Sequence, residues 1–134
     1  MSLYKKFKTS DEHEQNGVEL DYGEGCIIKI ARAGGANKRF LKCAEKFNRK
    51  YKRQLELEIL PDDVAYKAAV RMYAESVVLS WEGVTDQEGN ELECTVENVA
   101  KVLTDLPDLF SDIRRSATNH QLFKEYIDEK EAGN

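Results

Sequence analysis

The chain has 134 residues, of which 41% are hydrophobic and 34% are charged, and its formal net charge at pH 7 is −5. This length is enough to bury a real core, and it favours a single domain. No apolar run approaches the roughly 18 residues that cross a bilayer, and the first 17 residues contain no apolar segment typical of a secretory signal. We therefore expect a charge-rich helical protein without a membrane span or a secretory signal.

Charge is distributed unevenly along the chain. Residues 1–55 carry 13 Lys and Arg against 7 Asp and Glu, a net charge of +6, whereas residues 56–134 carry 7 against 18, a net charge of −11. Two interpretations remain open at this point. Either the basic half contacts nucleic acid, or the basic surface of one copy contacts the acidic surface of another copy.

The three cysteines, Cys26, Cys43 and Cys94, are far apart and form no C-x-x-C pair. An odd number of widely spaced cysteines favours reduced thiols in a cytoplasm over a disulfide framework. We expect all three to be small buried hydrophobic residues.

The first 30 residues predict a mobile arm followed by a β-hairpin. Residues 1–17 are polar and end in an Asn-Gly pair, which is typical of a flexible segment. Apolar and acidic residues alternate over residues 18–22, the period of a half-buried strand. The β-branched stretch at residues 26–30 predicts the returning strand, with a glycine-containing turn between the two.

Four helices are predicted in the rest of the chain. The first covers residues 38–55 and the second residues 62–82, where Gly83 ends a helix that is apolar around much of its girth. The third follows the N-cap residue Thr95, and the fourth begins at Pro107 or Asp108. The apolar stripes that define the first two helices are Phe40, Ala44, Phe47, Tyr51 and Leu55, then Tyr66, Val70, Tyr73, Val77 and Trp81.

These elements predict a mainly α fold, a single small helical domain of about four helices with a short N-terminal β-hairpin. The predicted domain spans residues 18–127. It follows the mobile arm at residues 1–17 and precedes a flexible C-terminal tail at residues 128–134.

An acidic cluster at residues 80–98 raises the question of a metal or catalytic site. An EF-hand loop needs glycine at its sixth position and glutamate at its twelfth. Counting from Asp86, Glu97 occupies the twelfth position, but the glycine falls at the fourth position instead of the sixth, so the EF-hand spacing is not met. Nothing predicts the apolar pocket that would raise the pKa of a carboxylate at position 86 or 88. We expect a polar surface turn around Gly89-Asn90.

No motif predicts nucleophilic or cofactor chemistry. His13 and His120 lie in the predicted arm and near the chain end, and neither a G-x-S-x-G motif nor a zinc ligand set is present. Gly34-Gly35 precedes a helix but lacks the spacing of a phosphate-binding loop. We expect no catalytic, cofactor-binding or metal-binding residue. An enzyme that uses the acids at 86–93 or a cysteine is the weakest alternative.

Eight of the twenty Lys and Arg residues lie within residues 38–53. A small adaptor or nucleic-acid-binding module that uses the Lys38 to Arg53 helix is one interpretation, although the acidic total charge disfavours nucleic acid. A solvated face or a docking surface for an acidic partner is the favoured interpretation. Apolar residues near the C-terminus could meet a neighbouring copy or a client helix, or pack within their own domain. The candidate partner or self-association residues are Lys42, Lys46, Arg49, Lys50, Arg53, Leu122, Phe123 and Tyr126.

Four motifs follow one another along the chain: R-A-G-G-x-N at 32–37, W-E-G-V-T-D-x-x-G at 81–89, T-x-E-N-V at 95–99 and L-x-D-L-P-D-L-F-x-D-I at 103–113. In this order and spacing the chain resembles the tail assembly chaperones of bacteriophages with long, flexible tails. The resemblance covers most of residues 27–123. The first residues and the last ten are not covered by it.

The resemblance implies a non-enzymatic role in the host cytoplasm. Such chaperones coat the tape measure protein as homo-oligomers and leave as the tail tube grows, so the mature virion lacks them. A frameshift-extended form commonly recruits the tail tube protein. The +6 and −11 halves fit head-to-tail contacts between copies, which give an open spiral unless the rotation closes them. Neither nucleic acid nor a membrane is expected as a partner.

Overall fold

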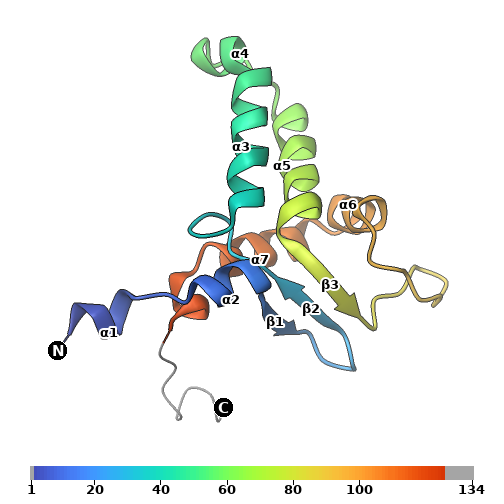
Figure 1. Cartoon of the computed structure of the whole chain (residues 1–134). Coiled ribbons are helices and arrows are strands. Elements are labelled where there is room, and N and C mark those ends of the chain that lie inside the picture. Colours follow the sequence, from blue (N-terminus) through green and yellow to red (C-terminus); the bar gives the residue numbers. More distant parts are fainter. Residues whose placement is uncertain (1, 126–134) are drawn as a thin grey trace.

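The computed structural model describes residues 2–125, and Figure 1 shows the arrangement of the elements. Helices at both ends of the described chain flank a small sheet, and two long helices extend away from it. The elements in chain order are α1 (Leu3–Phe7), α2 (Asp11–Asn16), β1 (Val18–Asp21), β2 (Ile27–Ile30), α3 (Lys38–Lys50), α4 (Lys52–Glu56), α5 (Asp62–Ser76), β3 (Val78–Glu82), α6 (Val96–Asp105), α7 (Pro107–Ala117) and the 3-10 turn η1 (His120–Phe123).

The sheet has three antiparallel strands in the order β1-β2-β3. Val18 lies opposite Ile30 in the first pair, and Ile28 lies opposite Trp81 in the second. The predicted hairpin of β1 and β2 is present. Its turn contains Glu24 at a φ of 53°, between two glycines that also have positive φ, a conformation that glycine adopts without steric cost.

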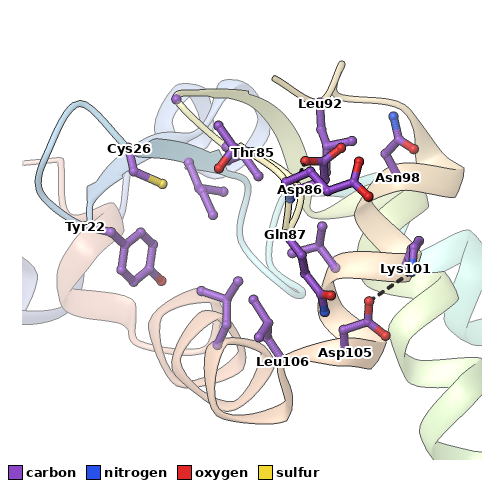
Figure 2. A pocket seen from close by; sticks show the side chains of 16 residues that line it. Tyr22, Cys26, Thr85, Asp86, Gln87, Leu92, Asn98, Lys101, Asp105 and Leu106 are labelled. Atoms are coloured by element: carbon purple, nitrogen blue, oxygen red, sulfur yellow. Dashed lines mark hydrogen bonds and ion pairs between the residues drawn. The ribbon is translucent and has the colours of Figure 1, made fainter. Parts of the chain in front are cut away.

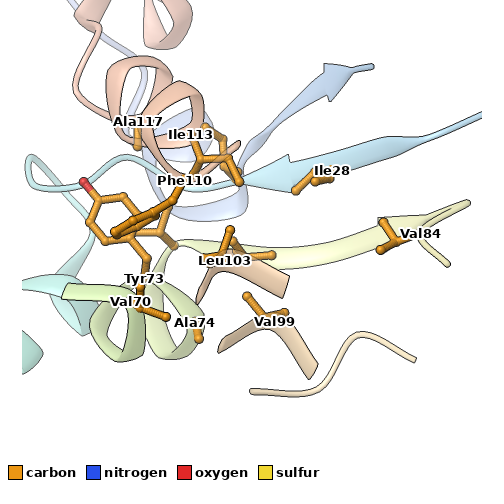
Figure 3. Packing of buried hydrophobic residues seen from close by; sticks show 13 residues of the cluster. Ile28, Val70, Tyr73, Ala74, Val84, Val99, Leu103, Phe110, Ile113 and Ala117 are labelled. Carbon is orange, nitrogen blue, oxygen red and sulfur yellow. The ribbon is translucent and has the colours of Figure 1, made fainter. Parts of the chain in front are cut away.

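The hydrophobic core lies between the sheet and the helices α5, α6 and α7 (Figure 3). Phe110 of α7 is at its centre and meets two tyrosines of α5 edge to face. The ring centroids are 5.5 Å apart for Tyr66 and 5.2 Å apart for Tyr73, a preferred geometry for aromatic pairs. The largest fully buried side chains are Phe110, Phe123, Ile30, Leu103, Ile113, Val77, Val99 and Ser76.

The predicted fold class is wrong in two respects. Residues 2–125 contain seven α-helices rather than about four, and the sheet is not only an N-terminal hairpin. The predicted second helix ends at Ser76, and residues 78–82 form β3 instead of its last turn. The spacing of Val77 and Trp81 fits a helical stripe, but β-branched residues also suit a strand. Pairing with β2 decides the outcome, because it completes the sheet over the core.

The segment predicted as a mobile arm contains two of the additional helices, α1 and α2. At the other end, the predicted fourth helix is divided into α7 and η1, which are separated at Thr118 and Asn119. The predicted tail at residues 128–134 lies outside the described residues.

Glu14 fastens α2 to the R-A-G-G-x-N turn that precedes α3. Its side chain is buried and accepts hydrogen bonds from Arg32 Nη1 at 2.8 Å and from the backbone N–H of Ala36 at 2.6 Å. A Cβ at Gly35 would collide with the Glu14 carboxylate. Glycine is therefore needed at this position both for its φ of +54° and for space.

Asn37 joins the start of α3 to the end of α5. It is 4% exposed, and its side-chain oxygen accepts the N–H of Phe40 to cap α3. Its side-chain nitrogen donates to the carbonyl oxygens of Arg32 and Ser76, both at 2.8 Å. This one side chain sets the base of the pair α3–α5.

From that base, α3 and α5 extend side by side away from the sheet, with α4 at their far end (Figure 1). We call α3, α4 and α5 the finger. At 1.5 Å per residue, helices of this size are about 20 Å long. Two of the three helices of the finger have little support from the core, since neither α3 nor α4 buries a residue completely.

We predict that Glu14→Gln lowers the free energy of unfolding by about 2 kcal/mol at pH 7, because a buried charge-assisted hydrogen bond is lost. Burial raises the pKa of Glu14, but hydrogen bonds from Thr9, Ala36 and Arg32 outweigh it and leave the pKa below its usual 4.5. The stabilisation is therefore present above pH 4.5 and disappears as the pH falls through the lowered pKa.

Urea unfolding of both proteins between pH 7 and pH 3 measures this difference. The exposed neighbour Glu12 provides the control, since Glu12→Gln should change stability by less than about 0.5 kcal/mol. A difference between wild type and Glu14→Gln that stays constant over the whole pH range would contradict the assignment.

Candidate functional site

A groove runs along the finger between α3 and α5, and we call it the finger groove. Its volume is about 700 Å³. The floor is apolar and half-buried, and aromatic and aliphatic side chains from both helices contribute to it. The groove is lined by Cys43, Lys46, Phe47 and Lys50 of α3, by Tyr51 directly after α3, and by Val64, Lys67, Ala68, Arg71, Met72 and Glu75 of α5.

The finger groove exists because each helix has an apolar stripe that its partner covers only in part. Phe47 of α3 and Tyr51, the C-cap of α3, have ring centroids 5.1 Å apart, and both remain half-buried. On α5, Val64, Ala68 and Met72 recur at steps of four, so they share one helical face. The half of α5 that precedes Val70 has no fully buried residue. The open apolar surface of these two helices could pack against a third helix, as in a three-helix bundle.

Cations flank the floor of the finger groove. Lys46 and Lys50 lie on the α3 side, and Lys67 and Arg71 on the α5 side. Arg71 is already paired, because it contacts Glu75 at 2.9 Å and Glu97 at 2.8 Å. The rim nevertheless has four cations against the single acid Glu75. A helix with acidic flanks therefore matches this groove better than a basic one.

The five predicted basic residues divide into groups. Lys46 and Lys50 line the finger groove, whereas Lys50, Arg49 and Arg53 line a smaller hollow near α4, at the end of the finger. Lys42 is exposed on α3 and lines neither of them. At 100° per residue, Lys42 and Arg49 point away from the helix face that carries Phe47.

The predicted C-terminal residues are placed differently. Phe123 is fully buried in η1, and its backbone oxygen accepts the N–H of Ser10 at 2.6 Å. Leu122 is half-buried. Both residues therefore pack within their own domain, which is one of the two alternatives that the sequence left open. Tyr126 lies outside the described residues.

A second groove lies at the end of the sheet, and we call it the sheet groove (Figure 2). Its volume is about 640 Å³. Buried Ile28 and Val84 and the half-buried Leu92, Val102 and Leu109 give it an apolar floor. Its rim carries Asp86, Glu88 and Asp105 against one cation, and that cation, Lys101, contacts Asp105 at 3.1 Å.

The loop between β3 and α6 forms one wall of the sheet groove. The predicted polar turn is present there, because the Asp86 side chain accepts the N–H groups of Glu88 and Asn90, both at 2.9 Å. These hydrogen bonds, that of Asn90 first, lower the pKa of Asp86. The indole of Trp81 donates to the Leu92 carbonyl at 2.8 Å and ties the loop to β3. Thr95 caps α6, as its sequence position predicts.

The side chains that could carry chemistry are dispersed. The His120 ring stacks on Phe7, with centroids 5.3 Å apart, and His13 lies in α2. Tyr22 donates to Asp112 at 2.6 Å, and its pKa is raised by burial and by this hydrogen bond. Burial also raises the pKa of the Cys94 thiol. Within residues 2–125, no three His, Cys, Asp or Glu side chains are grouped as a metal site requires.

No helix in the described part of the chain is both long enough and apolar enough to span a bilayer.

The two grooves described above have rims of opposite charge, the finger groove cationic and the sheet groove acidic. Grooves of this kind bind segments of other polypeptides, and their floor and rim select the segment.

A profile of the family described as YdaY prophage protein matches residues 35–134 of the chain. The chain belongs to the YdaY prophage protein family. It is therefore a phage-derived protein, and this coarser part of the resemblance is confirmed. No curated protein and no solved structure matches the chain.

The YdaY match includes every residue of the finger groove. It also includes α6, α7 and the β3–α6 loop, but the sheet groove has three further lining residues, Tyr22, Cys26 and Ile28, from outside the matched range. The sequence alone does not place the α5 side of the finger groove. The signal for it is the second stripe of α5, Val64, Ala68 and Met72, which is visible as a repeat of four residues.

We predict that Trp81→Phe loosens the wall of the sheet groove. It removes one hydrogen bond, at a cost of about 1 kcal/mol. Hydrogen–deuterium exchange should increase at the amides of Asp86 and Leu92, which donate to Asn90 and Val84 within this loop. Glu88→Gln, an exposed change in the same loop, should leave the exchange unaltered. Unchanged protection in Trp81→Phe would show that the indole does not hold the loop.

Proposed function

We propose that this YdaY family protein is a tail assembly chaperone, and that the finger groove binds a helical segment of the tape measure protein. The observation that supports this most directly is the open apolar face shared by α3 and α5. A client helix placed there would be the third helix of a bundle. The resemblance of the motifs to those of phage tail assembly chaperones is the reason for proposing the tape measure protein as the client.

Binding in this groove would protect the client in a simple physical way. A long helical polypeptide aggregates through its apolar stripe, and the floor formed by Phe47, Tyr51 and Met72 offers that stripe an alternative partner. Apolar burial contributes about 25 cal/mol per Å². The cations at the rim favour a stripe that is flanked by acidic residues and disfavour a basic one.

Reversible release also follows from this arrangement. The groove is shallow and open along the finger, so each copy covers only a short segment of the client. Many weak contacts along one polypeptide give a high total affinity, and they can be lost one by one as the tail tube grows. The proposed chaperone acts in the host cytoplasm, is absent from the mature virion and is not an enzyme.

Self-association completes the proposal. Residues 38–53 on the finger have eight cations and one acid, whereas residues 19–25 and 82–93, at the sheet end, have eight acids and no cation. Figure 1 places these two regions at opposite ends of the molecule. Such a charge separation favours head-to-tail contacts, which lead to an open spiral along the client. A frameshift-extended form would then bring the tail tube protein to this assembly.

The nucleic-acid-binding alternative is less well supported. Phe47 and Tyr51 lie in the floor between two helices and not in an exposed row on which bases could stack. If the protein were retained on DNA or RNA at low salt, and released as the salt concentration rises, the alternative would gain over the chaperone proposal.

We predict that co-expression with the tape measure protein of the same phage keeps the tape measure protein soluble and that the two proteins copurify. Lys46→Glu/Lys50→Glu should abolish copurification, because it reverses two charges on the α3 side of the finger groove. Both residues are exposed, so the melting temperature should remain close to that of the wild type.

Lys42→Glu/Arg49→Glu is the matched control. It makes the same change in net charge on the same helix, but on the face that points away from the groove, and it should retain the client. If both double variants lose the client equally, binding depends on net charge and not on the groove. An insoluble tape measure protein with the wild type present would refute the function itself.

A further inference from the structure

The N-terminal arm, residues 2–8, exposes three large apolar side chains, of which Phe7 also stacks on His120 of its own chain. Leu3 is 70%, Tyr4 80% and Phe7 57% exposed, and α1 buries no residue. In a soluble domain, three large apolar residues exposed together on one short helix mark a contact surface.

The root of the N-terminal arm is nevertheless fixed to the domain. The carbonyl of Lys8 accepts the N–H of Glu125 at 3.1 Å, and the Lys8 ammonium contacts the same residue at 3.3 Å. Thr9 pairs with Lys124 as an isolated bridge. The arm is thus held at its base and directed outward, away from the core (Figure 1). Its position is set by the fold, but its apolar face is open.

Charge gives the arm a complementary surface on the chain itself. Residues 2–8 contain Lys5, Lys6 and Lys8 and no acid. The sheet groove has the opposite character, with Asp86, Glu88 and Asp105 at its rim over an apolar floor. Leu106 at this rim is 51% exposed, an apolar side chain that a docked segment would cover.

The arm and the sheet groove lie on opposite sides of the molecule. Figure 1 places α1 beside α2 and η1, whereas the groove lies beside the β3–α6 loop at the far end of the sheet. An arm fixed at Lys8 to Glu125 is therefore directed away from the groove of its own chain. A second copy can present its groove to this arm without a change in either fold.

We propose that the N-terminal arm of one copy docks in the sheet groove of the next copy. Leu3, Tyr4 and Phe7 contact the apolar floor, and the lysines that precede Lys8, the root of the arm, face the acidic rim. The contact is heterologous, because each copy gives an arm and receives one, so it extends along the assembly until a terminal copy. This inference rests on the proposed self-association, but it assigns the contact with the acidic sheet end to the arm of the next copy instead of to the cations of the finger, and it leaves the finger groove free for the client.

Two variants test this docking. Leu3→Ser/Tyr4→Ser removes apolar contacts from the arm, and Leu106→Arg places a cation in the groove that receives it. Each lost apolar side chain should raise the dissociation constant about tenfold, so the arm variant should associate about a hundredfold more weakly. Sedimentation over a wide concentration range should find assemblies for the wild type and monomers for each variant alone.

An equimolar mixture of the two variants gives the sharpest result. The Leu106→Arg variant keeps its arm intact, and the Leu3→Ser/Tyr4→Ser variant keeps its groove intact. The arm of the first can therefore dock in the groove of the second, so the mixture should form a 1:1 dimer and nothing larger. Leu57→Ser, a change at an exposed leucine of the finger, should assemble like the wild type. Circular dichroism confirms that each variant is folded.

The outcomes separate this inference from the function. Variants that assemble like the wild type, or a mixture that stays monomeric, would overturn the docking of the arm. In either case, sedimentation of the wild type would still test self-association, and copurification would still test client binding. A wild type that is monomeric at every concentration would refute self-association together with this inference, while copurification with the tape measure protein would still decide client binding.

Discussion

The buried side chain of Asn37 is the contact on which the finger depends. It caps α3 and donates to the carbonyls of Arg32 and Ser76, so three segments of the chain meet at one amide. A hydrophobic side chain here would leave two buried carbonyls and one N–H without partners, each a cost of about 1–3 kcal/mol. The amide also fixes where α5 ends and β3 begins, and therefore joins the finger to the sheet.

A finger held at its base by a polar side chain need not bury its own apolar stripes. The core is completed by the sheet with α5, α6 and α7, and Phe110 fills its centre. The far part of α3 and α5 is left with an open apolar face and a cationic rim. At the sheet end of the molecule, hydrogen bonds of Trp81 and Asp86 hold the loop between β3 and α6. The inner side of this loop is apolar and its rim is acidic. In the proposed assembly, the opposite charges on the two grooves would keep their partners distinct.

Local signals predict much of this fold. The cap at Thr95 and the turn around Gly89 depend on hydrogen bonds within a few residues, and the start of α7 depends on the fixed φ of Pro107. All three are where the sequence indicates. Local signals do not predict β3. The spacing of its apolar residues favours a helix while its β-branched residues favour a strand, and the pairing with β2 decides for the strand. The basic side of the finger groove is visible in the sequence, whereas the groove itself depends on how far α3 and α5 cover each other. The extent of this coverage is set by tertiary packing, and the periodicity of apolar residues in the sequence does not predict it.

The cysteines provide the most direct test of the central claim that the finger groove holds the client. Cys43 lines the finger groove, 3.8 Å from a Glu75 carboxylate oxygen, and the half-buried Cys94 lies in neither groove. The measurement is the rate at which a maleimide alkylates Cys43, relative to Cys94, in the free protein and in the complex with the tape measure protein. The account predicts that the client slows the reaction of Cys43 and not that of Cys94. An equal rate for Cys43 with and without the client would contradict it.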